Sequence, residues 1–318
     1  MSRKDRIEQA LLAFFATRTD GTSAAVFRVG MGLLAVWQAF GIWLNLDRFY
    51  GDTGVVPFEV VKGDNLVWLS LFSIAPASRA VLLFHAIAFT VGSVALLFGL
   101  YPRIASLLVA YLHVSMQMRN PFILNSGDRL FMIVLALGAA MPLANRASIH
   151  AFVRKLRGKP ELPLSTVWGQ RLVGLQISYV YLNTVIAKLS NERWREGLAL
   201  RDVLASPVFA EWPRYIESKP LIMGMTYSTL VFELTFPIAI WFKKTRPWWL
   251  LWGIGFHLMI DALMVIPIFS WIMIVSYASF LSDSEVKWLL SKLRLRKAAA
   301  STDEATERSE RPVPSPSS

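Results

Sequence analysis

Long blocks of apolar residues recur along this 318-residue chain, and they constrain its fold more than any other feature. About 20 apolar residues in a helix span a bilayer core, and fewer suffice where partner helices cover polar positions. We predict eight transmembrane helices, at roughly 23–46, 80–99, 103–119, 129–145, 168–189, 224–242, 246–263 and 265–282. The third and fourth of these blocks are short and the last two nearly merge at Ile266-Pro267, so seven or nine spans are alternatives to eight.

The composition excludes an ordinary soluble enzyme. Hydrophobic residues make up 54% of the chain and charged residues only 17%, whereas soluble domains carry about 25% charged residues. Cysteine is absent, which excludes disulfides and thiolate metal sites within this chain. We therefore predict an all-α integral membrane protein with about eight transmembrane helices.

The segments that flank these blocks predict four regions. In residues 1–21, basic side chains precede an apolar helical face that includes Ile7 and Leu11, which is typical of an amphipathic interfacial helix. Residues 22–283 form the transmembrane domain. Residues 284–300 are predicted to be a basic cytoplasmic helix, and the Ser/Pro/Glu-rich residues 301–318 a disordered tail.

The distribution of cations predicts the topology. With eight spans and an internal N-terminus, most of the 33 lysine and arginine residues fall on the inner side, and long mixed loops at 47–79, 119–128 and 191–220 fall on the outer side. Both termini are then cytoplasmic and the protein lies in the cell's inner membrane. The net charge of +11 is explained by loops held at an anionic membrane surface rather than by nucleic acid, which is not expected as a partner.

Ionisable residues inside spans are costly, so each calls for a partner or a function. Lys188 lies near the outer end of the span 168–189. Burial would favour its neutral amine, which could act as a general base, but a lysine that snorkels to the outer head groups is an alternative. His257 and Asp261 are four residues apart and are expected on one helix face, either for proton transfer or as a structural pair.

A dense polar stretch precedes the fourth span. It contains Arg119, Asn125, Asp128 and Arg129, which could form the wall of a polar binding pocket at the outer membrane surface. Asp128 could equally be a helix N-terminal cap. His85 and His113 are single histidines within spans, and nothing in their spacing requires a metal site, so no metal is predicted.

An ordered set of short segments runs along nearly all of residues 23–282: Phe27 to Leu34, Phe49 to Pro57, Arg119-Asn-Pro121, Asn125 to Leu130, Tyr181 to Leu189, Trp194 to Gly197, Phe232 to Pro237, Phe256-His-Leu258 and Phe269 to Met273. Taken together and in this order, these segments resemble the HTTM family, the membrane domain shared with vitamin K-dependent γ-carboxylase.

The resemblance implies quinol chemistry at an outward-facing cavity. In the carboxylase, a lysine in the matching segment deprotonates vitamin K hydroquinone, and Lys188 matches that lysine. The carboxylase has Asn-Asn-His where this chain has Asn125-Ser-Gly-Asp128, and Asp128 is typical of bacterial members. The lost histidine, and the lack of a counterpart to the carboxylase's large extracytoplasmic domain after residue 282, weigh against peptide γ-carboxylation.

Two functions follow as expectations. The first is a carboxylase-like oxidoreductase or lyase that uses a vitamin K-type quinol, with Lys188, His257 and Asp261 as catalytic residues and Arg119, Asn125, Asp128 and Arg129 binding the cofactor. The second is a non-enzymatic membrane factor for maturation or export of a small secreted peptide. The partners are then membrane lipid or quinone, or that peptide. A small-solute transporter is less favoured because no inverted repeat is visible in the sequence.

Overall fold

The computed structural model describes residues 2–61, 70–73, 78–209 and 217–293. The predicted tail at 301–318 and the end of the predicted basic helix at 284–300 lie outside these residues. The body consists of α2 (Thr22–Leu44), α4 (Arg79–Phe98), α5 (Pro102–Arg119), α6 (Ser126–Gly138), α8 (Trp168–Leu189), α11 (Lys219–Ala239), α12 (Arg246–Leu263) and α13 (Phe269–Ser276).

Short elements connect and flank these helices. They are α1 (Arg3–Ala16), β1 (Arg18–Thr19), η1 (Leu46–Tyr50), α3 (Phe58–Val61), η3 (Leu71–Ser73), η4 (Pro121–Ile123), α7 (Ile149–Leu156), β2 (Ser165–Thr166), α9 (Glu192–Arg195), α10 (Ala199–Ala205) and η5 (Tyr277–Phe280). Residues 283–293 are also helical. The two short strands pair antiparallel, with Arg18 opposite Thr166 and Thr19 opposite Ser165.

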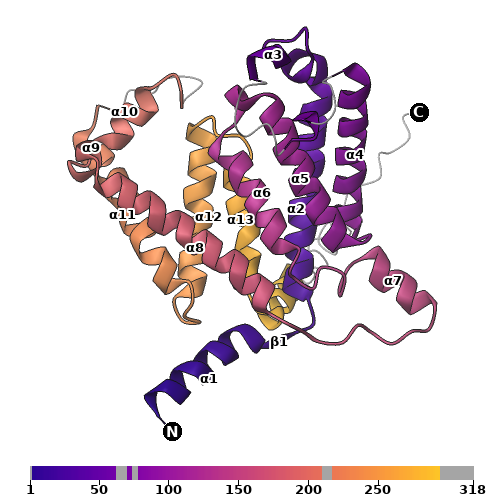
Figure 1. The fold of residues 1–318 in the computed structure, drawn as a ribbon. Coiled ribbons are helices and arrows are strands. Elements are labelled where there is room, and N and C mark those ends of the chain that lie inside the picture. The colour runs from indigo at the N-terminus through magenta and orange to yellow at the C-terminus, as the bar shows by residue number, and fades with distance from the viewer. Residues whose placement is uncertain (1, 62–69, 74–77, 210–216, 294–318) are drawn as a thin grey trace, which may run out of the picture.

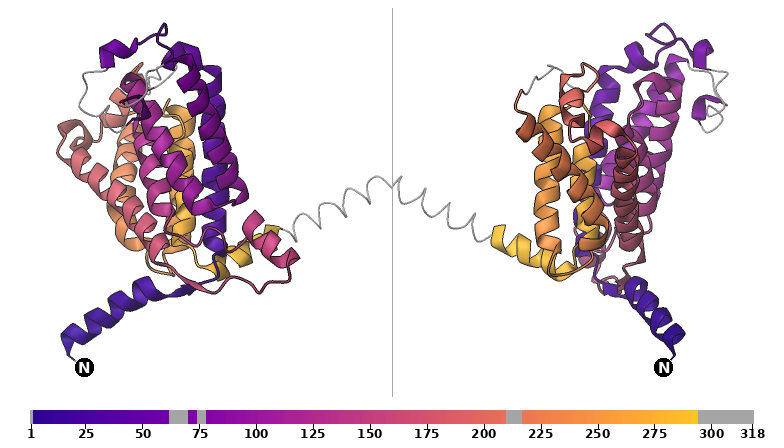
Figure 2. Two further views of the ribbon diagram at one scale, coloured as in Figure 1. Left: turned by 45° about the vertical axis from the view of Figure 1, so that its right-hand side comes forward. Right: turned by 90° about the vertical axis from the view of Figure 1, so that its left-hand side faces the viewer.

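The body is a helical bundle with two groups of helices (Figures 1 and 2). The first group, α2, α4, α5 and α6, packs in chain order, each helix against the next. The second group contains α8, α11 and α12. Helix α13 lies between the groups and contacts α2, α6, α8 and α12, so the chain's last apolar block closes the bundle.

Each predicted span contains a helix, but only four helices in the described part of the chain are long and apolar enough to cross a membrane by themselves: α2, α4, α8 and α11. Two predicted spans are shorter than expected. Helix α6 ends at Gly138, before Pro142, and α13 begins only after Pro267, because proline cannot continue the hydrogen-bonding pattern of a helix. The last two blocks are therefore separate helices.

Aromatic side chains and close helix contacts form the core. Phe27, Phe89, Phe131 and Phe236 are fully buried. At Gly32 a Cβ atom would lie 2.5 Å from the Cα atom of Leu97, so glycine is what allows α2 and α4 to approach closely. Small residues at helix interfaces are typical of membrane bundles, where packing rather than water exclusion drives association.

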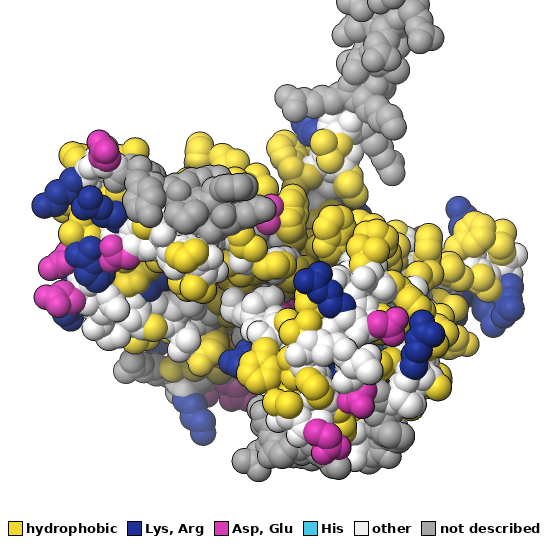
Figure 3. Space-filling view, turned by 90° about the horizontal axis from the view of Figure 1, so that it is seen from above, with side chains coloured by type: hydrophobic (Ala, Val, Ile, Leu, Met, Phe, Trp, Pro, Cys, Tyr) yellow, Lys and Arg dark blue, Asp and Glu magenta, His cyan; other side chains and the backbone are white. Residues whose placement is uncertain are grey.

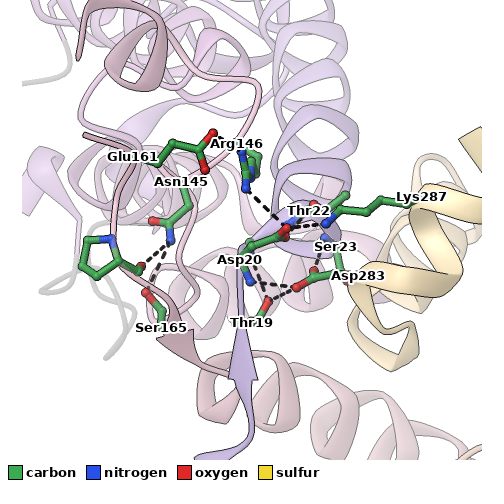
Figure 4. A network of polar contacts seen from close by, with 12 residues as sticks. Thr19, Asp20, Thr22, Ser23, Asn145, Arg146, Glu161, Ser165, Asp283 and Lys287 are labelled. Carbon is green, nitrogen blue, oxygen red and sulfur yellow. Dashed lines mark hydrogen bonds and ion pairs between the residues drawn. The ribbon is translucent and has the colours of Figure 1, made fainter. Parts of the chain in front are cut away.

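The two ends of the bundle differ. One end, which we call the basic end, carries α1, the β1–β2 pair, α7 and residues 283–293, whereas the opposite end, the pocket end, carries η1, α3, η4, α9 and α10 (Figures 1 and 2). At the basic end Asp283 accepts hydrogen bonds from the backbone amides of Asp20 and Ser23, at 2.8 and 3.0 Å, and so caps α2 (Figure 4). Lys287 pairs with Asp20 in the same network.

Helix α1 projects from the basic end of the bundle (Figure 1). Its last turn is fixed by Arg171, whose guanidinium lies over the Phe14 ring at 4.7 Å and donates to the Phe14 carbonyl at 3.2 Å. Ile7 and Leu11 are more than half exposed. The helix predicted in residues 1–21 is therefore present, and its location at a membrane surface stays a prediction.

Candidate functional site

A cavity of about 230 Å³ lies at the pocket end, between α8, α11 and α12 and beneath α9 and α10. The start of α6 and the segment that connects α12 to α13 complete its wall through Ser126 and Met264. Most of the lining is apolar. Its polar groups are Lys188, Glu233, His257, Tyr181 and a few hydroxyls, and we call this cavity the Lys188 pocket.

Lys188 and Glu233 form an ion pair in this pocket. The Lys188 side chain is 22% exposed and the Glu233 side chain 5%. The lysine Nζ also lies 4.7 Å from the centre of the Trp194 ring, which α9 places over it. The ammonium is therefore directed at a carboxylate and an aromatic face, not at the lipid head groups that a snorkelling lysine would reach.

Helical spacing explains how these groups come together. Tyr181, Thr184 and Lys188 are three, four and seven residues apart and share one face of α8. Thr229 and Glu233 are four residues apart on the facing side of α11, and Glu233 is the acidic residue of that helix. The sequence predicts Lys188 as a candidate site residue, but its pairing with Glu233 follows only from the packing of α8 against α11.

A second chain of hydrogen bonds begins at the pocket wall. His257 Nε2 lies 2.7 Å from the Tyr181 hydroxyl, which in turn lies 2.5 Å from the Tyr277 hydroxyl. All three residues are buried. The histidine is thereby linked through Tyr181 of α8 to Tyr277 of η5, with one ring nitrogen engaged by a tyrosine. Neither tyrosine was predicted as a site residue, because phenol groups on apolar helices resemble ordinary core residues.

Two buried polar atoms of the pocket residues have no hydrogen bond within the described part of the chain: Oε2 of Glu233 and Nδ1 of His257. Buried polar groups are nearly always hydrogen-bonded in native proteins. Because these two atoms belong to residues that line a cavity, a polar ligand bound there could form the missing hydrogen bonds.

A lateral groove of about 510 Å³ adjoins the pocket between α11 and α12. Thr229 and Phe256 line both hollows, so these two side chains form the partition between them. Gly224 and Gly255 line the groove, and a Cβ atom on either would meet nothing within 4 Å. The groove lies on the apolar flank of the bundle, where lipid would be in contact with a membrane protein.

Helices α9 and α10 are fixed over the pocket by polar contacts. Arg193 binds Asp202 through two hydrogen bonds of 2.7 and 3.0 Å, and these bonds lower the pKa of the Asp202 carboxyl below its ordinary value. The Tyr227 hydroxyl of α11 donates to the Arg195 carbonyl at 2.9 Å. Seen from the pocket end, charged side chains of both signs gather on the left of Figure 3, over α9 and α10. This cap is therefore polar outside and apolar toward the pocket.

The predicted pairing of His257 with Asp261 is wrong. His257 is 1% exposed and faces the interior, whereas Asp261 is exposed on the outer surface of α12 and does not line the pocket. Four residues correspond to about 400° of rotation, so the two side chains differ by about 40° around the helix axis. Near the end of a helix this difference is enough to move one side chain out of a narrow interior stripe.

The predicted polar wall around Arg119 is a separate structural cluster. Arg119 is fully buried and donates to the carbonyls of Val56 and Gly51, at 3.0 and 2.9 Å, which fixes the loop after η1. Of the stretch 119–129, only Ser126 lines the Lys188 pocket. Arg129 is exposed. The placement of Arg119 and Arg129 in that pocket is therefore corrected.

Asn125 and Asp128 form a capping box at the start of α6. Asn125 Oδ1 accepts from the Gly127 amide at 2.7 Å, and Asp128 Oδ2 accepts from the Asn125 amide at 3.0 Å. Asp128 is also buried beside His113, with Oδ1 and Nε2 3.3 Å apart, and beside Gln38. The cap that the sequence allowed is present, and neither Asn125 nor Asp128 lines the Lys188 pocket.

Metal-binding geometry is not found among the described residues, where no three His, Asp or Glu side chains gather closely enough to hold an ion. His85 is engaged through Nε2 with the Leu112 carbonyl at 2.8 Å. It therefore contributes to packing between α4 and α5.

Comparison with known proteins places this architecture in a family. The chain is 23% identical over 184 residues to the uncharacterized protein YitO of Bacillus subtilis (strain 168), a match that covers 55% of this chain and 59% of that protein. The chain thus spans somewhat more than half the length of this relative. No solved structure matches the chain. The HTTM domain model matches residues 16–288, the whole of the helical bundle, and this chain is therefore a helical membrane protein of the HTTM domain family.

Proposed function

We propose that this protein binds the head group of a vitamin K-type quinol in the Lys188 pocket and that the Lys188–Glu233 pair takes a proton from it. The observation that carries the proposal is the ion pair itself, enclosed in a largely apolar pocket under an aromatic cap. Intramembrane ionisable residues that face a cavity are functional candidates by default.

The residues present fit such a ligand. Trp194, Phe256 and Phe269 supply apolar ring surfaces, and the free Oε2 of Glu233 and Nδ1 of His257 supply polar atoms. A quinol offers two hydroxyl groups on a flat aromatic ring, and when bound it would supply an ionisable proton and two electrons. These donors would satisfy acceptors that the described protein leaves unpaired.

Proton transfer requires the uncharged form of the pair. Lys188 can accept a proton only as the neutral amine, so Glu233 must at that moment hold the proton as a carboxylic acid. A dry cavity reduces the energetic difference between the charged pair and the neutral pair, because separated charges lose their hydration there. Glu233 thus sets the protonation state of Lys188 Nζ, and Trp194 stabilises the ammonium once it forms.

The size of the site favours a head group. Ligand pockets usually measure about 300–1,000 Å³, whereas the Lys188 pocket measures about 230 Å³. A ring with its apolar tail in the adjoining groove fits this division better than a peptide does. The quinol hypothesis is therefore preferred over the peptide-maturation hypothesis.

The proposed topology has eight spans, with the basic end in the cytoplasm and the pocket end outside. The cationic side chains of α7 and of residues 283–293 support it. Phosphatase and fluorescent reporters fused at the C-terminus and inserted at Glu217 test the topology. We expect opposite compartments, and two reporters active on the same side would overturn it.

The test of the function compares Lys188→Arg with Lys188→Ala in the full-length protein in nanodiscs. The assay is oxidation of menadiol by dissolved oxygen above the uncatalysed rate. Arginine keeps the charge but cannot release its proton at accessible pH, so both variants should be inactive while yield and melting temperature persist for the arginine variant. Activity restored by arginine, or no activity in the unaltered protein, would refute the proposal.

A further inference from the structure

A second hollow, of about 650 Å³, lies at the basic end of the bundle, far in the fold from the Lys188 pocket. It is formed by α7, by the segment before α7 and by residues 159–162, which return alongside it. Four cations line it: Arg146, Arg154, Lys155 and Lys159. None of its residues takes part in the proposed quinol chemistry, so we call it the α7 hollow and consider it separately.

The charges around the α7 hollow do not balance. Its carboxylate is Glu161, which binds Arg146 at 3.0 Å, and Arg146 also contacts Asp20 at 3.5 Å (Figure 4). Arg146 is therefore already neutralised. Within the described chain no ion pair forms with Arg154, Lys155 or Lys159, although Arg154 donates to the Pro160 carbonyl at 3.1 Å.

A buried arginine behind the wall adds to this positive charge. Arg28 of α2 is fully buried, donates to the Ala147 carbonyl at 2.5 Å, and has no carboxylate partner in the described part of the chain. A Cβ atom at Gly99 would overlap its guanidinium, so the chain leaves room for it there. A charge in a low-dielectric interior is weakly screened, and its field therefore reaches the adjacent hollow.

Helix α7 has the form of an interfacial helix. Ile149, Phe152 and Leu156 recur at intervals of three and four, and Phe152 and Leu156 are 61% and 70% exposed. Arg154 and Lys155 occupy its last turn. The helix stands apart from the bundle at the basic end (Figures 1 and 2). An exposed apolar stripe beside cations is typical of helices that lie at the membrane surface.

We propose that the α7 hollow binds the head group of an anionic phospholipid, whose phosphate lies among Arg154, Lys155 and Lys159. The exposed apolar side chains on either side of the hollow, Phe98 of α4 and Phe152 of α7, receive the acyl chains. Charge complementarity selects this occupant, because the three cations lack counterions while the flanking surface is apolar. A free phosphate would use the cations but not the apolar flank.

The experiment uses the full-length protein in a zwitterionic or nonionic detergent, titrated with dioctanoyl phosphatidylglycerol or dioctanoyl phosphatidylcholine. Bound lipid is counted by native mass spectrometry. The variant of the α7 hollow, which we call the pocket variant of this experiment, is Lys155→Gln/Lys159→Gln. The matched control is Lys243→Gln/Lys244→Gln, which removes two exposed lysines from the connection between α11 and α12 at the same end. Both pairs are exposed, so neither substitution should disturb folding.

We expect the unaltered protein and the control to prefer phosphatidylglycerol, and the pocket variant to lose on the order of tenfold in its apparent affinity for that lipid, since each basic residue near a membrane surface contributes about 1 kcal/mol. Equal losses in both variants would reduce the site to general surface charge. Equal affinity of the unaltered protein for the two lipids would overturn the proposal. So would competition by inorganic phosphate or glycerol 3-phosphate as potent as that of the diacyl lipid.

Discussion

Lys188 of α8 and Glu233 of α11 face each other across a helix interface and form an ion pair within a pocket, although they lie 45 positions apart in the chain. The pair argues against the snorkelling interpretation of Lys188, and the role of Lys188 as a general base stays a proposal. A snorkelling lysine would extend past the end of its helix, whereas this one turns toward a carboxylate that is only 5% exposed. The lysine is thus part of a polar site inside an apolar bundle.

Removing one member of the pair should cost more stability than removing both. Glu233→Leu leaves an unpaired ammonium, and we expect it to lower the free energy of unfolding by up to about 3 kcal/mol. Lys188→Met combined with Glu233→Leu replaces both charges with apolar groups of similar length, so the double variant should regain most of that loss. Thermal unfolding in detergent measures both effects.

The control for this cycle is the exposed pair of Arg193 and Asp202, for which Arg193→Gln should change the melting temperature little, because solvent screens that contact. Losses that simply add for Lys188 and Glu233 would contradict a buried, coupled pair. The double variant should remain inactive even where it is stable, which separates the chemical role from the structural one.

The hydroxyl of Tyr181 should matter more than that of Tyr277. Tyr181→Phe deprives both His257 and Tyr277 of a buried partner, and we expect it to cost about 1–3 kcal/mol in stability. Tyr277→Phe leaves the contact between Tyr181 and His257 intact, so its cost should be smaller. Equilibrium unfolding and quinol turnover are the measurements. Equal effects of the two variants would contradict a hydrogen-bond chain in which Tyr181 is the central member.

Much of the fold could be predicted from the sequence because helix formation in a membrane depends on local composition. The apolar blocks gave every helix of the body, with four of them long enough to span alone. The lengths of α6 and α13 were overestimated because the apolar composition continues past Pro142 and before Pro267, whereas the helical hydrogen-bonding pattern does not continue through a proline. A hydropathy profile does not detect this difference.

The site was predictable only in part, because it is made by packing between distant helices. Lys188 stood out as a charge in an apolar segment, and His257 as a histidine in another, and both line the pocket. Glu233 is also an ionisable residue within an apolar block, but its pairing with Lys188 depends on which helices are neighbours. Asp261 was misplaced because a spacing of four does not fix which way a face points.

Acid should destabilise the basic end through Asp20. Burial tends to raise the pKa of this carboxyl, but hydrogen bonds from Lys287 and Thr22 outweigh burial and hold the pKa well below its ordinary value. A depressed pKa stabilises the fold at pH values above the unfolded-state pKa, near 4, and this stabilisation is lost as pH falls further. Asp20→Asn should therefore lower the melting temperature at pH 6 and reduce its dependence on pH below about 4.

Asp47→Asn is the control for this titration, because it makes the same substitution at a side chain that is 65% exposed and that pairs with Arg79 at 3.4 Å. It should leave the melting temperature at pH 6 nearly unchanged. Melting curves for the three proteins between pH 3 and pH 7 make the comparison. Identical acid sensitivity of the unaltered protein and Asp20→Asn would show that other carboxyls govern the effect.

Filling the lateral groove should block long-chain quinols and spare short ones. Gly224 and Gly255 line the groove, and because a Cβ atom on either would meet nothing within 4 Å, Gly224→Leu and Gly255→Leu should be tolerated by the fold. Replacing glycine inside a helix is itself stabilising by up to about 1 kcal/mol. The new side chains would occupy the space that an isoprenoid tail needs beside Thr229 and Phe256.

Gly41→Leu on α2 is the matched control, because a Cβ atom there also meets nothing within 4 Å and Gly41 lies outside the groove. Turnover of menadiol, which has no tail, should be unchanged in all three variants, whereas turnover of a menaquinol with several isoprene units should fall at least tenfold for Gly224→Leu and Gly255→Leu only. Equal loss for both quinols would mean that the leucines distort the Lys188 pocket. Unchanged turnover of the long-chain quinol would instead place its route elsewhere, because a bulky side chain in the groove beside Thr229 and Phe256 cannot leave a tail there undisturbed.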